Sequence, residues 1–198
     1  MPEIKIRKAR EGDSVKEITP LICRSDPTLY RDLFKTHIIA EEILGVLLCT
    51  KESIFYRDNY YVAMYKNDIV GLSAAHEIGS FWDPAYIVEA YQNIGVSLPE
   101  CFDEISQYYS NLFLSSNERV ILRNLSTKIG CERRGVATRL IKKTIEDYND
   151  KVLEFSVLKN NTEAIKLYES LGFRKENIVE EYGGCKKQNV ICYRMVRP

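Results

Sequence analysis

The hydrophobic pattern of the first part of the chain predicts a strand, two helices and a hairpin. Charged and apolar side chains alternate at the start, which is typical of a strand at the edge of a sheet. Apolar residues then recur at helical spacing in two stretches, the first with Asp13 and Ser14 as caps. Two β-prone runs follow and flank a short polar turn, which indicates a hairpin. These elements are expected at residues 4–9, 13–22, 28–48, 60–65 and 69–75.

The last part of the chain predicts a βαβ unit, a further helix and a closing hairpin. One helix has an apolar face that returns every fourth residue, so one side packs and the other faces water. The next helix begins with the capping pair Asn160 and Glu163 and ends at Gly172, where a left-handed residue is favoured. The expected elements are strands at 120–127 and 152–158, helices at 135–148 and 162–171, and hairpin strands at 177–182 and 189–196. No linker or repeat divides the sequence, so we expect a single domain over residues 1–198.

Residues 77–118 form an acidic and aromatic segment. It holds seven acids and no Lys or Arg, so it carries a charge of −7 in a chain whose 28 basic and 28 acidic residues cancel. It also holds eight of the 21 aromatic residues. We expect a helical insertion here, whose carboxylates and rings would attract a cationic ligand. A lid or a dimer surface with aromatics in the core is the alternative interpretation.

Composition and charge exclude several classes of protein. A net charge of zero provides no general attraction to nucleic acid or to anionic lipid. The longest apolar run, 43–49, is far shorter than the roughly 20 residues of a membrane span, and residues 1–10 contain no signal-peptide core. The six cysteines form no C-x-x-C pair and the two histidines show no ligand spacing. We therefore expect no metal, and reduced, mostly buried thiols in the cytoplasm.

The clearest chemical signal is the segment 131–143, which opens a helix directly after a strand. Free amide groups and the positive end of the helix dipole converge at residues 134–137. Gly135 lets a ligand approach the backbone, and five basic side chains against Glu132 give the segment a charge of +4. This arrangement predicts an anion site that would suit a diphosphate.

A second motif accompanies this loop. The sequence Arg-Arg-Gly-Val-Ala at 133–137 is followed at 161–173 by Asn-x-x-Ala-x-x-x-Tyr ending in Leu-Gly-Phe. Together these motifs resemble the GNAT superfamily of acetyl-CoA-dependent N-acyltransferases. The diphosphate motif of that family is Gln/Arg-x-x-Gly-x-Gly/Ala, and Glu132 departs from it at the first position. The resemblance is close over residues 120–173 and looser over the hairpin at 61–72, and it does not extend to the acidic segment.

The resemblance implies a mixed α/β (α+β) fold with a single domain. The mostly antiparallel sheet would be splayed between two parallel strands and have helices on both faces. Acetyl-CoA would be the cosubstrate, attacked directly by a primary amine in a ternary complex, with a main-chain amide near 125–127 polarising the thioester carbonyl. The implied cofactor-binding residues are Leu125, Ser126, Thr127, Arg133, Arg134, Gly135, Val136, Ala137, Thr138, Asn161, Ala164 and Tyr168.

Tyr168 is the expected general acid. It lies seven residues after Asn161, which is two helical turns, so both side chains project from one face. A phenol beside the sulfur can donate a proton or a hydrogen bond to the departing thiolate. The alternatives are that Tyr168 only packs on the sheet and that Asn161 serves as a helix cap.

The base that removes the proton of the amine is less well defined. Glu77 is our candidate, and His76, Glu180, Glu181 and Tyr182 remain open. We expect a small cationic amine as acceptor, such as a polyamine-like or aminoglycoside-like compound, and a homodimer stays open. Two rival functions are a non-catalytic module that binds or senses acyl-CoA, and an N-acetyltransferase that acts on a peptide or protein.

Overall fold

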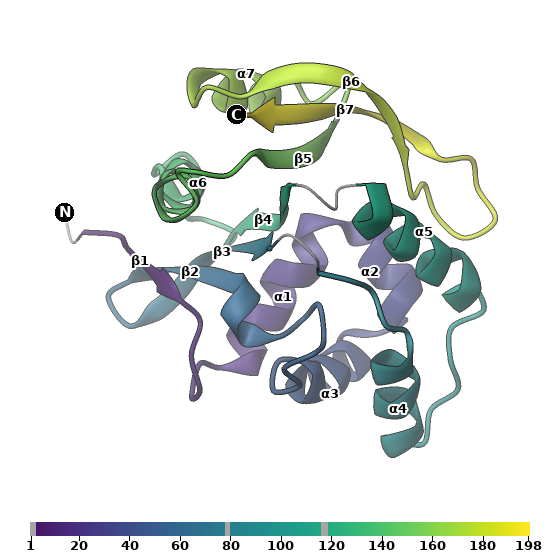
Figure 1. The fold of residues 1–198 in the computed structure, drawn as a ribbon. Coiled ribbons are helices and arrows are strands. Elements are labelled where there is room, and N and C mark those ends of the chain that lie inside the picture. Colours follow the sequence, from purple (N-terminus) through teal and green to yellow (C-terminus); the bar gives the residue numbers. More distant parts are fainter. Residues whose placement is uncertain (1–2, 78–79, 116–118) are drawn as a thin grey trace.

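The computed structural model describes residues 3–77, 80–115 and 119–198, which form a seven-stranded sheet (Figure 1). The strand order is β1-β2-β3-β4-β5-β7-β6. Within the described strands, β4 and β5 are parallel and every other neighbouring pair is antiparallel. The expected mixed, mostly antiparallel sheet is therefore confirmed. The strands are β1 (Lys5–Lys8), β2 (Tyr60–Tyr65), β3 (Asp68–His76), β4 (Val120–Thr127), β5 (Leu153–Leu158), β6 (Arg174–Glu181) and β7 (Val190–Arg197).

Helices cover both faces of the sheet, as expected (Figure 1). One face packs on α1 (Val15–Ser25), α2 (Pro27–Phe34), α3 (His37–Leu47), α4 (Ala85–Asn93) and α5 (Phe102–Ser115), and the other on α6 (Val136–Asp147) and α7 (Thr162–Ser170). Neighbouring residues of β2 enter different cores, because side chains alternate across a strand: Tyr60 packs with the first group of helices and Tyr61 with the second. No helix in the described ranges is long and apolar enough to cross a bilayer.

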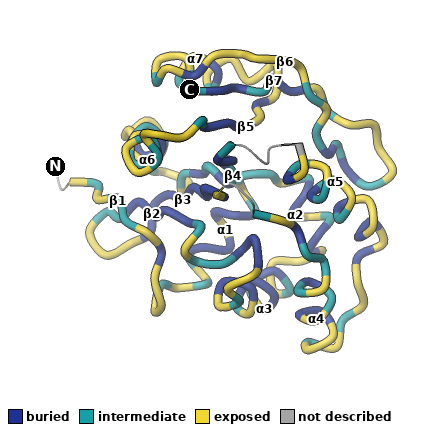
Figure 2. The backbone as a smooth tube through the Cα atoms, viewed as in Figure 1, coloured by how far each residue is buried: buried dark blue, intermediate teal, exposed yellow. Residues whose placement is uncertain are grey.

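Burial follows this layered arrangement. The strands in the middle of the sheet are largely buried, whereas β6 at the sheet edge is mostly exposed (Figure 2). The close approach of α6 to β3 depends on Gly71, because a Cβ there would lie 2.3 Å from Val136 Cγ1. Gly71 thus lets the start of α6 sit directly on the sheet, which positions the loop that precedes it.

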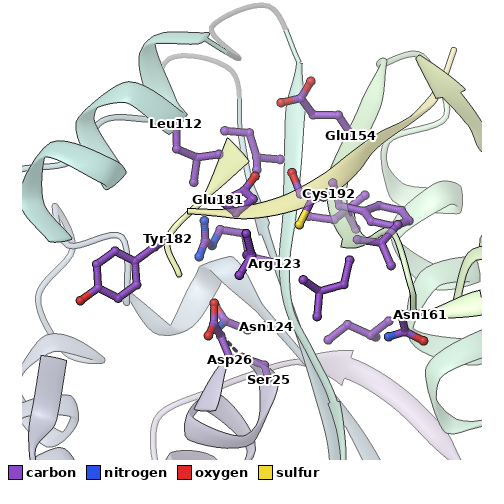
Figure 3. A pocket seen from close by; sticks show the side chains of 18 of the residues that line it. Ser25, Asp26, Leu112, Arg123, Asn124, Glu154, Asn161, Glu181, Tyr182 and Cys192 are labelled. Atoms are coloured by element: carbon purple, nitrogen blue, oxygen red, sulfur yellow. Dashed lines mark hydrogen bonds between the residues drawn. The ribbon is translucent and has the colours of Figure 1, made fainter. Parts of the chain in front are cut away.

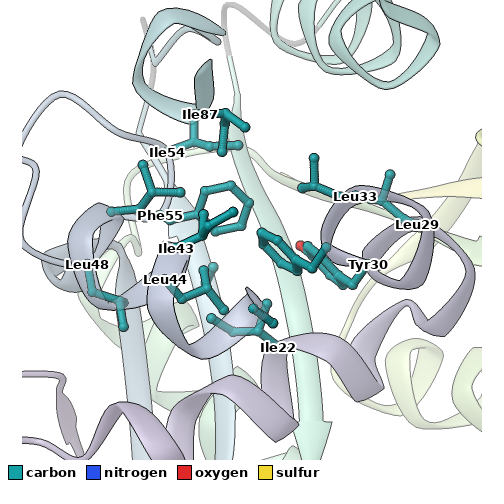
Figure 4. Packing of buried hydrophobic residues seen from close by; sticks show 14 of the residues in the cluster. Ile22, Leu29, Tyr30, Leu33, Ile43, Leu44, Leu48, Ile54, Phe55 and Ile87 are labelled. Atoms are coloured by element: carbon teal, nitrogen blue, oxygen red, sulfur yellow. The ribbon is translucent and has the colours of Figure 1, made fainter. Parts of the chain in front are cut away.

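The single helix expected over residues 28–48 is two helices, so that expectation is wrong. The chain turns at Lys35, which has a φ of 61°, and the Thr36 hydroxyl then accepts a hydrogen bond from the Ile39 amide at 3.3 Å. A threonine that caps a new helix competes with continuation of the old one. The break lets Leu33 of α2 and Leu44 of α3 join the same hydrophobic core (Figure 4).

The acidic segment is helical, as expected, and supplies α4 and α5. Most of its aromatic side chains are buried in the core, and Trp82 stacks on Tyr109 with 4.5 Å between ring centroids. The interpretation of these rings as core residues is therefore the correct one. The acids Glu89, Asp103 and Glu104 are exposed. Glu118 lies outside the described residues.

A disulfide joins Cys101, at the start of α5, to Cys185 in the β6–β7 connection, with 5.5 Å between the Cα atoms. The expectation of reduced thiols is wrong for this pair, which the sequence separates by 84 residues. The same connection is tied to α2, because Asp32 accepts hydrogen bonds from the Tyr182 hydroxyl and the Cys185 amide. An ion pair of Lys186 with Glu100 adds a further contact. The β6–β7 connection is thereby held against two helices.

Candidate active site

The two parallel strands separate almost as soon as they meet. They pair only where Val120 meets Leu153 and Ile121 meets Glu154. Beyond these pairs β4 keeps its partner β3 and β5 keeps its partner β7. The sheet is therefore split between β4 and β5, as the resemblance implied.

A bulge in β4 accompanies the split. Arg123 pairs with Ala74 and Ser126 with Leu72, so two residues of β4 lie opposite one residue of β3. Asn124 occupies the bulge with a φ of 54°, and its amide donates hydrogen bonds to the Ser25 and Tyr30 hydroxyl oxygens at 2.9 and 2.6 Å. A bulge bends its strand and increases the local twist. Here it directs the end of β4 away from β5.

A cavity of about 380 Å³ lies in this gap (Figure 3). Its walls come from β4, β5 and α7, and from the start of α2, one side of α5 and the end of β6 with the connection that follows. Three of the expected cofactor-binding residues line it, namely Leu125, Asn161 and Tyr168. The β4 and α7 motifs thus converge on one hollow.

The expected diphosphate loop lies at the N-terminus of α6, outside the cavity walls. Gly135 is the residue before the helix, with a φ of 75°, and no side chain caps the first turn. A Cβ at Gly135 would meet no atom within 4 Å, so the space in front of the amides is open. Arg133 and Arg134 are exposed beside it. Uncapped amides, an open approach and two guanidinium groups form an anion site that fits a diphosphate.

The other expected cofactor-binding residues lie on three elements: the first turn of α6, the end of β4, and α7. Val136 is buried against the sheet, so only its amide can face a ligand, whereas Ala137 and Thr138 are half-buried in the first turn. Ser126 and Thr127 lie on β4 between the cavity-lining Leu125 and the loop, paired with Leu72 and Gly71 of β3. Ala164 is half-buried on α7.

Glu132, the departure from the family motif, braces the loop. Its carboxylate accepts a hydrogen bond from the Gly130 amide at 2.7 Å and pairs with Arg24 at 3.1 Å. Its own amide and that of Gly130 lower the pKa of the Glu132 carboxyl. The Glu132 carboxylate therefore stays ionised, and it stabilises the loop through its contacts with Gly130 and Arg24.

Tyr168 packs on the sheet and also lines the cavity. Its ring packs edge-on against Phe155, with centroids 4.0 Å apart, while the residue remains half-buried and lines the cavity. Its hydroxyl has no hydrogen-bond partner among the described residues. Burial raises the pKa of Tyr168 to about 12, so the phenol is protonated at neutral pH. Asn161 caps α7, since its side chain accepts a hydrogen bond from the Ala164 amide at 3.2 Å, and it also lines the cavity.

Glu77 does not lie with these residues. It is exposed and accepts a hydrogen bond from the Tyr148 hydroxyl at 3.2 Å, at the C-terminal end of α6. The 12 residues of α6 place that end about 18 Å from the diphosphate loop. The cavity walls do not include Glu77, so the geometry counts against it as the base.

Two of the other base candidates line the cavity. Glu181 and Tyr182 contribute to its walls, whereas Glu180 faces an adjoining hollow of about 570 Å³ between α5 and β6. His76 is buried against Phe113 and is not in the cavity wall. Burial and the nearby charges of Arg123 and Lys8 lower the pKa of His76 to about 3. The His76 imidazole is therefore neutral, and Glu181 and Tyr182 are the base candidates that line the cavity.

Asp26, Tyr108 and Arg123 are among the cavity-lining residues that sequence reasoning missed. Arg123 Nη1 donates to the Tyr108 hydroxyl oxygen at 2.9 Å, and that hydroxyl donates to Glu181. Burial raises the pKa of the Asp26 carboxyl. A signal for Arg123 was available, because an arginine within the apolar run of β4 is unusual in a buried strand. No group of three or more His, Cys, Asp or Glu in the described part of the chain could hold a metal.

Comparisons with known proteins identify the family. The model of the Acetyltransferase (GNAT) family matches residues 27–173, and no curated protein sequence matches the chain. Among solved structures, an N-acetyltransferase from Staphylococcus aureus Mu50 is 18% identical with a TM-score of 0.64, covering 97% of this chain and 99% of that one. Another, described as an acetyltransferase, is 16% identical with a TM-score of 0.75 and 98% of both chains covered. A GNAT family acetyltransferase from Elizabethkingia anophelis with acetyl-CoA bound is 16% identical with a TM-score of 0.54, covering 98% and 97%. These likenesses support the fold, and the family model spans most of the sequence, so the chain belongs to the GNAT family of acetyltransferases.

Proposed function

We propose that this N-acetyltransferase transfers the acetyl group of acetyl-CoA to the primary amine of a small molecule held between β4 and β5. The cavity carries this proposal. Its volume of about 380 Å³ suits a small ligand, and α2, α5 and the disulfide-tied β6–β7 connection contribute to its walls. Acceptors in the family include both small molecules and proteins. A protein acceptor would be better served by an open, extended groove.

The cofactor half of the site follows from the loop and the two motifs. The first-turn amides of α6, with the neighbouring guanidinium groups, would hold the diphosphate. The backbone at the end of β4 would run beside the pantetheine, and the face of α7 would lie near the sulfur. The residues proposed for these contacts are Leu125, Ser126, Thr127, Arg133, Arg134, Gly135, Val136, Ala137, Thr138, Asn161, Ala164 and Tyr168.

The chemistry needs a base and an acid on opposite sides of the acetyl group. Glu181 would accept a proton from the ammonium group of the acceptor, which leaves a lone pair on nitrogen. That nitrogen would attack the acetyl carbonyl carbon, and the carbon–sulfur bond would break with its electron pair on sulfur. Tyr168 would donate a hydrogen bond or proton to the resulting thiolate. Glu181 replaces Glu77 as the proposed base.

The expected preference for a cationic acceptor is supported by acidic residues other than those of the 77–118 segment. Among the described acids of the 77–118 segment, none lines the cavity, so the original reason for that preference is lost. Asp26 and Glu181 line it instead and favour the protonated form of an amine before catalysis. A homodimer and a cytoplasmic location stay predictions.

The experiment compares Glu181→Gln with Glu77→Gln while thiol release from acetyl-CoA is measured over a panel of amines. We expect kcat to fall by about 100-fold in Glu181→Gln, the scale of a lost general base, and to stay within about twofold in Glu77→Gln. The opposite ranking would restore Glu77 as the base. Binding of CoA without turnover of any amine or peptide would favour a sensing module, and turnover of peptides alone would favour a protein acceptor.

A further inference from the structure

Arg123 is the one cationic side chain among the described residues that line the cavity. It projects from β4 just before the bulge, into the space that Glu181 enters from β6 (Figure 3). The base and acid of the proposed reaction do not require a cation here. A charged group in a pocket wall without a catalytic task indicates recognition of the ligand.

The guanidinium of Arg123 is held by aromatic groups. Its central carbon lies 5.1 Å from the ring centroid of Tyr109 and 5.5 Å from that of Tyr108. A guanidinium has five N–H donors, and one of them bonds to the Tyr108 hydroxyl oxygen. No carboxylate of the described residues forms a salt bridge with it within 4.0 Å. The stacked rings thus orient a planar fork of donors that retains capacity for a ligand.

The acidic residues that line the cavity differ in whether they are already paired with another arginine. Glu154 is held by Arg119 at 3.2 Å and by Arg194 at 3.9 Å, so it belongs to a separate ion-pair cluster. Asp26 and Glu181 interact with Arg123 through the longer-range field, without a direct ion pair. The cavity thereby offers a cationic donor fork next to two carboxylates.

We propose that the acceptor is a zwitterion of the amino-acid type, whose carboxylate binds the Arg123 fork while its ammonium group faces Asp26 and Glu181. This inference rests on the proposed N-acetyltransferase function and narrows its substrate class. A carboxylate matches the planar fork with two parallel hydrogen bonds. A phosphate would bring a second negative charge beside Asp26 and Glu181, and a polyamine would place a second cation beside Arg123. A single carboxylate next to a single ammonium group fits the charges of the cavity best.

The test uses matched series that differ only at the carboxylate: leucine, leucinamide and 3-methylbutylamine; phenylalanine, phenylalaninamide and phenethylamine; lysine, lysinamide and cadaverine. The kcat/KM for acetylation is measured for each compound. In at least one series we expect the amino acid to exceed its amide by about 100-fold, the scale for a ligand that leaves a buried charge unpaired. In Arg123→Gln this ratio should fall close to one, and in Arg123→Lys, which keeps a point charge without the fork, it should be intermediate.

The ratio of two substrates does not depend on the folded fraction of a variant, so partial misfolding of Arg123→Gln cannot imitate the result. Arg174→Gln, which removes an exposed arginine from β6, is the matched control and should keep the wild-type ratio. Amides or simple amines that react as well as the amino acids in every series would overturn the inference and leave the acetyltransferase function intact. If nothing is acetylated, the proposed function fails, and calorimetry in the presence of CoA decides the carboxylate site. Binding of an amino acid but not its amide would then support the site, and equal or absent binding of both would overturn it.

Discussion

The substitution Tyr168→Phe tests the acid side of the proposed reaction. It removes one oxygen and keeps the ring that packs on Phe155 and Phe173. Because the hydroxyl has no protein partner among the described residues, its loss should change the free energy of unfolding by less than about 0.5 kcal/mol. Any large effect on kcat would then come from chemistry and not from folding.

The size of that effect follows from the pKa of the phenol. Burial raises the pKa of Tyr168 to about 12, whereas a thiol of the cysteine type has a pKa of about 8.5. Full proton transfer from phenol to thiolate is therefore uphill by about 5 kcal/mol. The phenol then acts mainly as a hydrogen-bond donor to a charged acceptor, which is worth about 1.5–3 kcal/mol. We expect kcat to fall by about 10- to 150-fold.

The assay is thiol release at saturating acetyl-CoA and acceptor, together with the KM of each. The KM for acetyl-CoA should change little, because the hydrogen bond forms mainly to the charge that develops on sulfur. Tyr148→Phe, at the far end of α6, is the matched control and should behave as wild type. A Tyr168→Phe enzyme within threefold of wild-type kcat would refute the role given to this phenol.

Three further experiments test the proposed site and the stability of the fold around it. Since the raised pKa of Tyr168 keeps the phenol protonated until about pH 12, kcat should show no loss from its ionisation between pH 8 and 10; an alkaline limb that disappears in Tyr168→Phe would contradict this. Gly135→Val places a β-branched residue at a φ of 75° and a side chain in the approach to the amides, so calorimetry should show at least a tenfold rise in the Kd for CoA, while Gly45→Ala in α3 should leave it unchanged. Reduction of the Cys101–Cys185 disulfide should cost about 2–4 kcal/mol and lower the Tm by about 5–15 °C in calorimetry, whereas an unchanged Tm would show that the bond adds no stability.

The elements that carry the proposed cofactor half of the site could be predicted because their signals are local in the chain. A strand that ends at Thr127, a glycine before the helix at 136–147 and a capped helix that begins at Thr162 all depend on neighbours within a few residues. The βαβ connection then brings the two helix starts to the same end of the sheet. For the same reason the boundaries of these elements agree with their expected positions within about two residues.

The acceptor half could not be predicted in this way. Arg123, Tyr108 and Glu181 come from β4, α5 and β6, and their hydrogen bonds depend on how α5 packs beside the end of β6. Glu77 follows a buried strand and fits the sequence pattern of a base, but that strand ends at the opposite end of α6 from the diphosphate loop. Only the strand pairing of the folded sheet decides that Glu181, and not Glu77, lines the cavity.

The amino-acid sequence by itself indicated the family and the cosubstrate, and it predicts the loop that would bind the cosubstrate, because its motifs, backbone amides and left-handed glycine are properties of short segments. The tertiary structure alone decided which residues share the cavity between β4 and β5, and that Cys101 meets Cys185 beside it. The physical reason is that contacts between distant segments are set by the packing of whole elements, which no local pattern of side chains encodes.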